Sequence, residues 1–200
     1  MLTIAWDVDD VLNNLLTDWL AAWCAVRGDS ARVAYADLTE NPPDRLLGIS
    51  REEYLASLDA FRNSDVARHL QPVPEVLDWF ERKGDRYRHL ALTARPLETV
   101  PAAAEWVMRH FGTWIRTFHY VPADRPGRAL PRYDVTKAEF LGWLGKADVL
   151  VDDTPANLES CPALGIAAVL VPRPWNGGVG DITTALELLD RELEIRESRE

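Results

Sequence analysis

The sequence predicts an α/β fold in which a mainly parallel, five-stranded sheet carries one small helical insertion after its first strand. Its 200 residues and ordinary composition, with 47% hydrophobic and 27% charged residues, suit one domain with a small insertion. Strand-like and helix-like segments alternate along most of the chain, which is the pattern of parallel strands joined by helices. One stretch breaks this alternation, because no convincing strand occurs between residues 28 and 85.

The first strand is expected over Leu2–Trp6, where apolar residues predict burial. A helix follows over Val11–Arg27, with leucine and tryptophan at helical spacing and Gly28 as its end. Four further strands are expected at Arg86–Leu92, Thr117–Val121, Asp148–Val151 and Ala167–Val171. Further helices are expected at Glu75–Arg82, Ala102–Phe111, Thr136–Leu144 and Pro155–Cys161. A last helix begins near Ile182, with Asp181 as its N-cap.

The interrupting stretch predicts a small helical domain over residues 15–71, whereas residues 1–14 and 72–200 form the core that contains the sheet. Ser50 and Glu53 form a capping box, which predicts that a helix begins at residue 50. Two prolines within Leu70–Pro74 indicate a linker that returns the chain to the sheet. We therefore expect the inserted helices to lie over one end of the sheet.

The net negative charge of the chain limits the classes of partner that we expect it to bind. The 22 Lys and Arg residues against 32 Asp and Glu residues give a net charge of −10 at pH 7, which argues against nucleic-acid polymers and anionic membranes. The longest apolar run, Ala163–Val171, is far shorter than a membrane helix. Cys24 and Cys161 form no metal or redox motif, and no signal-peptide pattern is present, so we expect a cytoplasmic protein. The sequence leaves the oligomeric state open.

Asp7, Asp9 and Asp10 directly follow the first predicted strand. Residues two apart on a strand share a side, so Asp7 and Asp9 can both face a site at its carboxyl end, where open α/β sheets bind ligands. Three acids this close repel one another unless a cation lies among them or one of them is protonated. The alternative is a solvated acidic turn.

Asp152 and Asp153 end the fourth predicted strand in the same way. If the two strands are neighbours, the acids at their ends form a cluster of hard oxygen ligands, which suits Mg²⁺ better than zinc. The alternative is that one of the two caps the helix that follows, a role compatible with metal binding by the other.

Thr93 and Lys137 are candidate phosphate-binding residues. Thr93 follows the second predicted strand, where its hydroxyl and the backbone N–H groups after it can bind an anion. Lys137 lies at the start of a predicted helix, a second place to hold phosphate. Alone, each is more typical of a turn or a surface. Their order along the chain gives them weight, since Asp-x-Asp, Thr, Lys and Asp-Asp each stand near a strand end or helix start.

This order resembles the haloacid dehalogenase (HAD) superfamily of aspartate-nucleophile phosphatases. Asp7–Leu12 resembles its first motif, Leu92–Arg95 its second, Lys137 its third and Val151–Thr154 its fourth. The resemblance implies a Rossmann-like three-layer core, with residues 1–14 and 72–200 as the catalytic core and residues 15–71 as a small helical cap.

Within the superfamily, the size of the insertion, Leu70–Pro74 and Pro174–Asn176 are most similar to the 5′(3′)-deoxyribonucleotidase branch. That branch dephosphorylates nucleoside monophosphates. Asp10 and Glu75 stand where the branch commonly has glycine, and Leu15 lies near the position of a base-stacking aromatic residue. The expected substrate is therefore a small phosphorylated metabolite, with a 5′-nucleotide as one option.

The resemblance also implies catalytic roles. Asp7 would be the nucleophile that forms an aspartyl-phosphate, and Asp9 would protonate the leaving oxygen and then take a proton from water. Neighbouring carboxylates would raise the pKa of Asp9 and Mg²⁺ would lower it, so the sign of its shift stays open. Mg²⁺ is expected at Asp7, the backbone carbonyl of Asp9, and Asp152 or Asp153, with Asp153 favoured.

Thr93, Ala94 and Lys137 would then hold the phosphoryl oxygens. Arg95 follows Thr93 and is a candidate substrate contact, although it could instead pair with an acid of the cap or of the first motif. Trp175, between proline and asparagine in a glycine-rich loop, is a second candidate substrate contact.

The other tryptophans are expected to be structural. Trp79, Trp106 and Trp143 lie on apolar helix faces and are predicted to be core residues. Trp19 and Trp23 are expected to pack within the cap, with stacking on a base as the alternative. A basic stretch over residues 116–137 either steers an anionic substrate or pairs with acidic neighbours. Its basic residues are Arg116, Arg125, Arg128, Arg132 and Lys137.

Taken together, these patterns predict an Mg²⁺-dependent phosphomonoesterase of the HAD type. A receiver-like signalling domain also uses an acid cluster, Thr and Lys around an aspartyl-phosphate, but its phospho-accepting aspartate ends a middle strand, whereas Asp7 follows the first strand. Two further alternatives remain at this point. One is a non-catalytic relative that binds a phosphorylated ligand. The other is a phosphotransferase of the same superfamily, which differs only in the group that accepts the phosphoryl.

Overall fold

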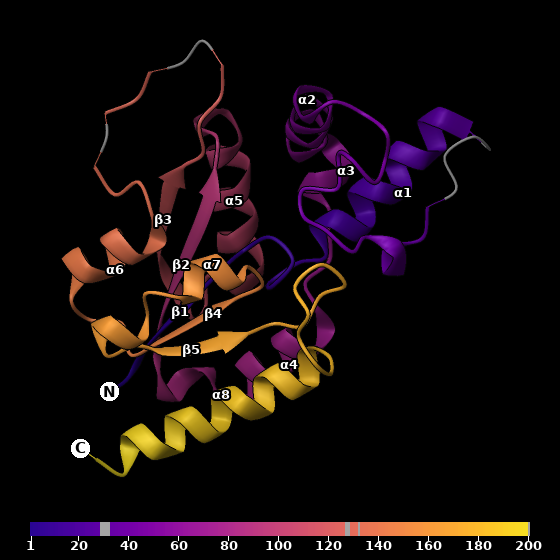
Figure 1. The fold of residues 1–200 in the computed structure, drawn as a ribbon. Helices are drawn as coiled ribbons and strands as arrows, with labels where there is room; N and C mark the ends of the chain where they lie inside the picture. The colour runs from indigo at the N-terminus through magenta and orange to yellow at the C-terminus, as the bar shows by residue number, and fades with distance from the viewer. Residues whose placement is uncertain (29–32, 127–128, 132, 200) are drawn as a thin grey trace.

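The structure is a computed structural model that describes residues 1–28, 33–126, 129–131 and 133–199. Its strands are β1 (Thr3–Trp6), β2 (Arg88–Arg95), β3 (Ile115–Pro122), β4 (Val149–Asp152) and β5 (Ala167–Leu170). They form one sheet in the order β3-β2-β1-β4-β5, and every neighbouring pair is parallel. The predicted five-stranded sheet is confirmed, with β1 at its centre (Figure 1).

Helices connect the strands. The α-helices are α1 (Leu15–Arg27), α2 (Arg51–Arg62), α3 (Asp65–Arg68), α4 (Pro74–Lys83), α5 (Val100–Phe111), α6 (Lys137–Leu144), α7 (Pro155–Leu158) and α8 (Ile182–Glu197). Short 3₁₀ turns are η2 (Tyr35–Asp37), η3 (Gly84–Arg86), η4 (Leu97–Thr99) and η5 (Pro162–Leu164). Within the described part of the chain, no helix is long and apolar enough to cross a membrane.

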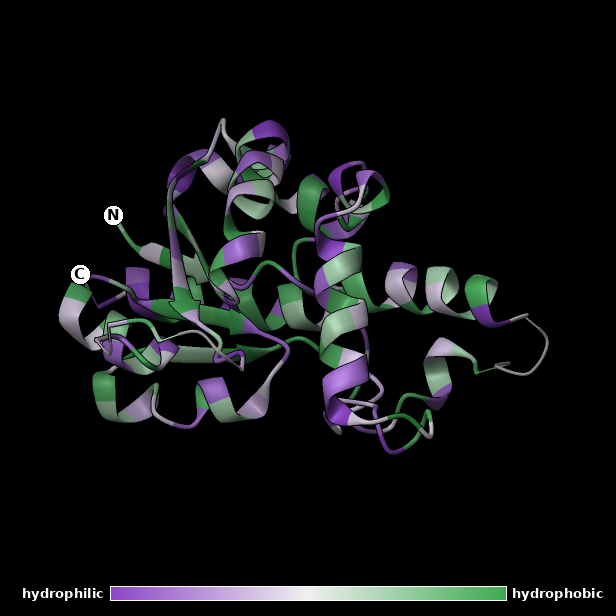
Figure 2. Cartoon of the chain, turned by 90° about the horizontal axis from the view of Figure 1, so that it is seen from above, coloured by the Kyte–Doolittle hydropathy of each residue, from purple (hydrophilic) through white to green (hydrophobic). Residues whose placement is uncertain are grey.

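Hydrophobic residues pack on both faces of the sheet, as expected for parallel strands. Figure 2 shows the hydropathy of each residue along the ribbon. Alternation along β1 sends Ile4 and Trp6 into a core shared with α4, α5 and α8, and sends Ala5 into a second core with α6 and α7. Trp6 is fully buried, with its ring 5.4 Å from Trp79 and 4.9 Å from Phe80. The arrangement confirms the predicted three-layer core.

The helices between residues 15 and 71 lie beyond the carboxyl ends of the strands (Figure 1). The chain leaves the core and returns to it at one place, because Asn13 and Pro72 form an antiparallel bridge and Val73 N–H donates to the carbonyl of Leu12 at 2.9 Å. The helices pack on one another through aromatic rings, with Trp19 5.2 Å from Tyr54.

Side-chain caps set several helix starts. Ser50 Oγ accepts the N–H of Glu53 at 3.1 Å and so begins α2, as predicted. The Glu53 side chain pairs with Arg27 instead of closing the expected box. Asp181 Oδ1 accepts the N–H of Thr184 at 3.1 Å, which confirms the N-cap predicted for α8.

One predicted core residue is exposed. Trp79 and Trp106 are buried, whereas Trp143 on α6 is 76% exposed. That helix buries Phe140 and Leu141, and Trp143 points away from the sheet. The prediction failed because the apolar residues of this helix are spread around its axis, so its sequence does not mark the face that packs.

Candidate active site

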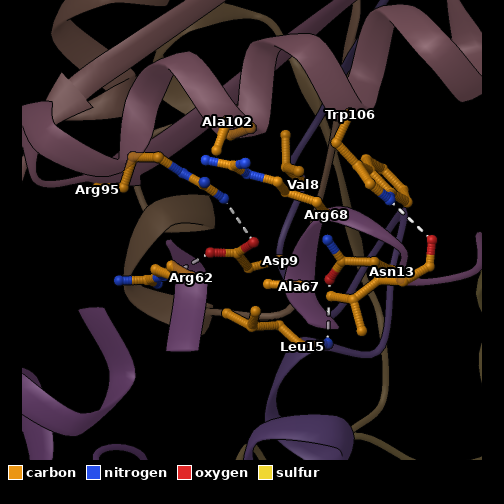
Figure 3. A pocket seen from close by; sticks show the side chains of 12 residues that line it. Val8, Asp9, Asn13, Leu15, Arg62, Ala67, Arg68, Arg95, Ala102 and Trp106 are labelled. Carbon is orange, nitrogen blue, oxygen red and sulfur yellow. Dashed lines mark hydrogen bonds and ion pairs between the residues drawn. The ribbon is translucent and has the colours of Figure 1, made fainter. Parts of the chain in front are cut away.

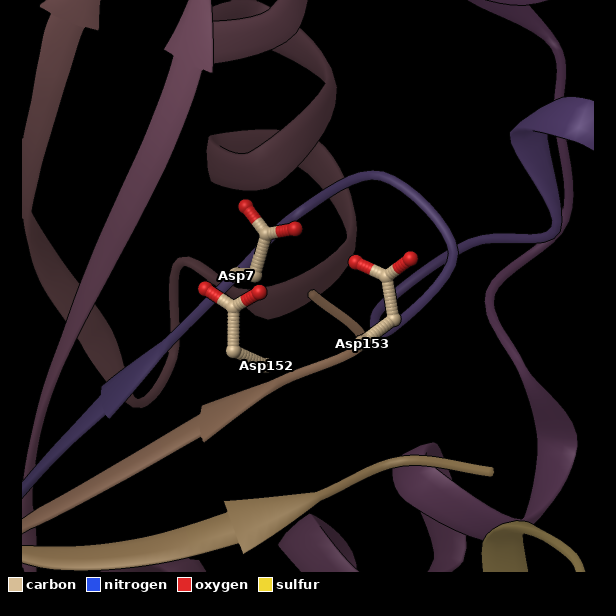
Figure 4. A group of neighbouring side chains, drawn as sticks. All are labelled: Asp7, Asp152 and Asp153. Atoms are coloured by element: carbon tan, nitrogen blue, oxygen red, sulfur yellow. The ribbon is translucent and has the colours of Figure 1, made fainter. Parts of the chain in front are cut away.

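The register of the sheet brings the predicted acids together. Trp6 on β1 lies opposite Val151 on β4, and Asp7 N–H donates to the carbonyl of Val151 at 2.9 Å. Asp7 therefore stands beside Asp152 at the carboxyl end of both strands. Asp7, Asp152 and Asp153 are buried, and one carboxylate oxygen of each lies within 4.8 Å of the others (Figure 4).

Lys137 bridges two of these acids from the first turn of α6. Its Nζ lies 2.7 Å from Asp7 Oδ1 and 2.6 Å from Asp152 Oδ2, and its side chain is 1% exposed. Burial opposes the charged form, but Asp152 and Asp7 outweigh it and raise the pKa of Lys137. The lysine of the predicted third motif thus enters the site as a fixed ammonium group.

The two acids that end β4 have different surroundings. Asp152 Oδ1 accepts the backbone N–H of Thr154 at 2.8 Å, and Asn157 Nδ2 lies 3.0 and 3.1 Å from the two oxygens. With Lys137 added, both oxygens of Asp152 have protein donors. Asp153 Oδ2 accepts Trp175 Nε1 at 3.0 Å, whereas the Thr154 hydroxyl is 3.4 Å from its Oδ1. Asp153 therefore keeps more capacity for a further ligand.

The acid cluster carries uncompensated negative charge. Burial raises the pKa of Asp7 well above its ordinary value, Lys137 opposes this rise, and the charges of Asp152 and Asp153 add to it. Burial, followed by Asp10 and Asp152, raises the pKa of Asp153 to about 7. Buried carboxylates of this kind are stabilised by a cation. Hard oxygen donors fit Mg²⁺, so the cluster has the chemistry of a magnesium site.

Asp9 lies between two arginines (Figure 3). Arg95 Nη2 donates to its Oδ1 at 2.6 Å, and Arg62 Nη2 donates to its Oδ2 at 2.9 Å. Burial opposes ionisation of Asp9, but Arg95 and Arg62 outweigh it and lower the pKa of its carboxyl group. Arg62 did not emerge from the sequence, although a signal existed: it shares one face of α2 with buried Tyr54 and Leu58.

Asp10 has a structural position that explains its unusual place in the motif. Its φ of 59° is in the left-handed region, where glycine, asparagine and aspartate occur most readily. Its Oδ1 accepts the N–H of Leu16 at 3.0 Å, and its carbonyl accepts Arg173 Nε and Nη2 at 2.8 and 2.6 Å. Burial raises the pKa of Asp10 to about 7. Asp10 thus ties the first motif to α1 and to the loop after β5.

A cavity of about 150 Å³ separates the sheet from α1 and α2. On the sheet side it is lined by Asp7, Asp9, Asp10, Thr93, Ala94, Lys137 and Asp153. On the other side it is lined by Leu15, Leu16, Tyr54, Leu58 and Arg62. Thr93 Oγ1 accepts Arg95 Nε at 3.3 Å, which leaves the hydroxyl hydrogen to donate elsewhere. The structure therefore gathers every predicted nucleophile, metal and phosphate residue except Asp152 along one cavity, with Asp152 directly behind Lys137.

Arg95 and Trp175, the predicted substrate contacts, have protein partners. Arg95 pairs with Asp9, which is an acid of the first motif and one of the partners considered above. Trp175 is outside the cavity lining and donates to Asp153. The indole therefore contacts the acid cluster and does not line the cavity.

The structure also shows the surroundings of two tryptophans in the predicted cap and of the basic stretch. Trp19 and Trp23 pack among the helices of residues 15–71, with ring centroids 6.0 Å apart, so the packing interpretation holds. In the basic stretch, Arg125 Nε lies 2.6 Å from Asp59 Oδ2 on α2, so this arginine pairs with an acidic neighbour. Arg128 and Arg132 lie outside the described residues.

Solved structures of other proteins share this architecture, although no match is found at the level of sequence. No protein-family model matches the sequence, and no curated protein matches it either. Among solved structures, a haloacid dehalogenase-like hydrolase from Streptococcus pneumoniae is similar with a TM-score of 0.61 and 14% identity, over 96% of this chain and 98% of that chain. The chain has the haloacid dehalogenase fold.

Other proteins with the HAD fold are also less than 20% identical to this chain. A candidate beta-phosphoglucomutase from Thermotoga maritima gives a TM-score of 0.56 at 19% identity, over 96% and 99% of the two chains. A HAD-hydrolase from Bacillus subtilis, whose structure is bound to magnesium, gives 0.53 at 10% identity, over 85% and 86%. At these identities the likeness concerns the fold.

Proposed function

We propose that this chain is an Mg²⁺-dependent phosphomonoesterase that uses Asp7 as its nucleophile on a small phosphorylated metabolite. The observation that carries the proposal is the pairing of Asp7 with Lys137 beside Asp153, at the edge of a cavity that Thr93 also lines. Hydrolases and a candidate phosphomutase share the fold, which supports phosphoryl chemistry.

The reaction would proceed in two steps. A carboxylate oxygen of Asp7 attacks phosphorus, the bond to the leaving oxygen breaks, and Asp9 supplies a proton to that oxygen. Water then attacks the aspartyl-phosphate, Asp9 accepts its proton, and Asp7 is regenerated with release of inorganic phosphate. The lowered pKa of Asp9 suits its role as base in the second step.

The charges around Asp7 would stabilise the transferring phosphoryl group. Lys137 places a permanent positive charge 2.7 Å from Asp7, and Asp152 holds that ammonium group from behind. The Thr93 hydroxyl and the backbone after it, at Ala94, would donate to phosphoryl oxygens. All these donors are fixed by the fold, so they need little reorganisation during the reaction.

Mg²⁺ would be held by Asp7, the backbone carbonyl of Asp9 and Asp153. When bound, it supplies positive charge that neutralises the cluster and the phosphoryl oxygens. The structure of a HAD-fold hydrolase bound to magnesium supports this choice of ion. We assign Asp152 to Lys137 rather than to the metal, because both of its oxygens already accept protein hydrogen bonds.

The cavity favours a small substrate. Its volume of about 150 Å³ lies below the roughly 300 Å³ at which pockets for drug-sized ligands begin. On its cap side Leu15, Leu16 and Leu58 supply apolar surface, and Tyr54 supplies one aromatic ring. We propose that residues 15–71 form a cap over the core of residues 1–14 and 72–200, and that this cap selects the substrate.

The test is phosphate release from sugar phosphates, small phosphorylated acids and nucleoside monophosphates, with Mg²⁺ or with EDTA. The wild type should turn over at least one compound only with Mg²⁺, and Asp7→Asn should abolish that turnover. Asp85→Asn, which alters an exposed aspartate in η3, is the matched control and should keep full activity. Folded, Mg²⁺-bound protein without turnover on any compound would contradict the proposal.

A further inference from the structure

The loop after β5 is built around one asparagine. Asn176 Nδ2 donates to the carbonyls of Asp153 and Val171 at 2.6 and 2.8 Å. Its Oδ1 accepts the N–H groups of Arg173 and Gly178 at 3.0 and 2.9 Å. These four bonds fix the loop against the end of β4, and they place the residue before Asn176 beside the acid cluster.

That residue is Trp175. Its Nε1 donates to Asp153 Oδ2 at 3.0 Å, and its ring meets Tyr35 of η2 edge-on, with centroids 5.7 Å apart at 84°. An indole N–H can only donate, so it needs an acceptor oxygen and restrains the orientation of the Asp153 carboxyl group. The only other side-chain donor to this carboxylate among the described residues is the Thr154 hydroxyl, at 3.4 Å. Trp175 therefore makes the shorter of the two side-chain hydrogen bonds that hold the Asp153 carboxylate in the described part of the chain.

The orientation of Asp153 matters for the cluster. Figure 4 shows its carboxylate turned toward that of Asp7, across the space between the ends of β1 and β4. Without a fixed partner, the side chain would distribute over its staggered rotamers and spend part of its time turned away. Groups that orient a metal ligand change metal affinity by roughly 10- to 100-fold when they are removed.

We propose that Trp175 is a positioning residue for magnesium, because its indole N–H holds Asp153 in the orientation that binds the ion. The inference rests on the proposed function, in which Asp153 is a metal ligand. It gives the indole a task at the metal and not at the substrate, in line with its place outside the cavity lining. Tyr35 supports the indole from the cap side through the edge-on ring contact.

The test measures the Kd for Mg²⁺ by isothermal titration calorimetry on metal-free protein. Trp175→Phe keeps an aromatic ring and removes the N–H, and it should raise the Kd by roughly tenfold or more. Trp143→Phe makes the same change at an exposed site and should leave the Kd unchanged. If the role is positioning, saturating Mg²⁺ should also restore the kcat of Trp175→Phe to within about threefold of the wild type.

Asp153→Asn separates this inference from the proposed function. If Asp153→Asn lowers Mg²⁺ affinity and Trp175→Phe stays within twofold of the wild type, the positioning role is wrong and the metal site stands. If Asp153→Asn itself binds Mg²⁺ normally, the proposed metal site is wrong. Should Trp175→Phe fail to fold, the replacement experiment is an Mg²⁺ titration of the wild type followed by ¹H–¹⁵N NMR. The indole N–H signal of Trp175 is assigned by comparison with Trp175→Tyr. The inference requires that this indole signal shifts when Mg²⁺ is added.

Discussion

Removal of Lys137 should destabilise the fold in a way that depends on pH. The ammonium group lies 2.7 Å from Asp7 and 2.6 Å from Asp152, and all three side chains are buried. Lys137→Met keeps the length of the side chain but leaves a buried carboxylate without its counter-charge. That carboxylate must then be protonated, which at pH 7 costs about 4 kcal/mol for a group with an ordinary pKa of about 3.9.

The pH dependence follows from the same reasoning. In Lys137→Met the pKa of the unpaired acid is raised in the folded state above its unfolded value, so the folded state gains stability as the pH falls. The cost of protonation drops to about 1.5 kcal/mol at pH 5. The deficit relative to the wild type should therefore shrink by about 2.7 kcal/mol between pH 7 and pH 5.

Urea unfolding at both pH values, in EDTA, measures this deficit. Lys146→Met is the control, because it changes an exposed lysine that, like Lys137, precedes β4 in the sequence. It should leave the free energy of unfolding within about 0.5 kcal/mol of the wild type. A deficit for Lys137→Met below about 1 kcal/mol at pH 7, or one that is equal at the two pH values, would refute the reasoning.

Three further predictions concern other parts of the site and core. Thr93→Val removes a hydroxyl from the cavity at nearly constant shape, and it should lower kcat/KM roughly 10- to 100-fold in steady-state assays. Arg62→Met removes one guanidinium from Asp9, so the pKa of Asp9 followed by carboxyl ¹³C NMR should rise; an unchanged value would show that the pair contributes nothing. Burial lowers the pKa of His89 to about 4, so the unfolded chain takes up its proton first as the pH falls. Between pH 7 and pH 5 the wild type should lose about 2 kcal/mol of stability that His89→Gln does not lose, measured by urea unfolding.

The fold was predictable because its signals are local. Strand lengths, helical spacing and caps such as Asp181 depend on residues close in sequence. The start of α1 was not predicted correctly, because the helix expected from Val11 begins only at Leu15. Asp10, with its left-handed backbone, and Asn13, whose Oδ1 accepts the N–H of Leu15 at 3.0 Å, form a turn that the apolar spacing conceals.

The acid cluster was also predictable, because parallel strands end at the same edge of a sheet. The different roles of the acids within the cluster were not predictable. The separate surroundings of Asp152 and Asp153 depend on Lys137, 15 residues away from Asp152, and on Trp175, 22 residues away from Asp153. Contacts of this kind form only when the loops that follow β3 and β5 fold onto the strand ends, and no spacing in the sequence reports them.

The pairs around Asp9 connect the proposed cap to the proposed chemistry. Arg62 and Asp59 belong to α2, whereas Arg95 and Arg125 belong to the core, and the four side chains and Asp9 form one continuous chain of ion pairs. Asp9 as it stands is a carboxylate, which suits the base that the hydrolysis of an aspartyl-phosphate needs. Donation of a proton needs the opposite state. Arg62 on α2 is one of the two cations that lower the pKa of Asp9, and Arg95 of the core is the other.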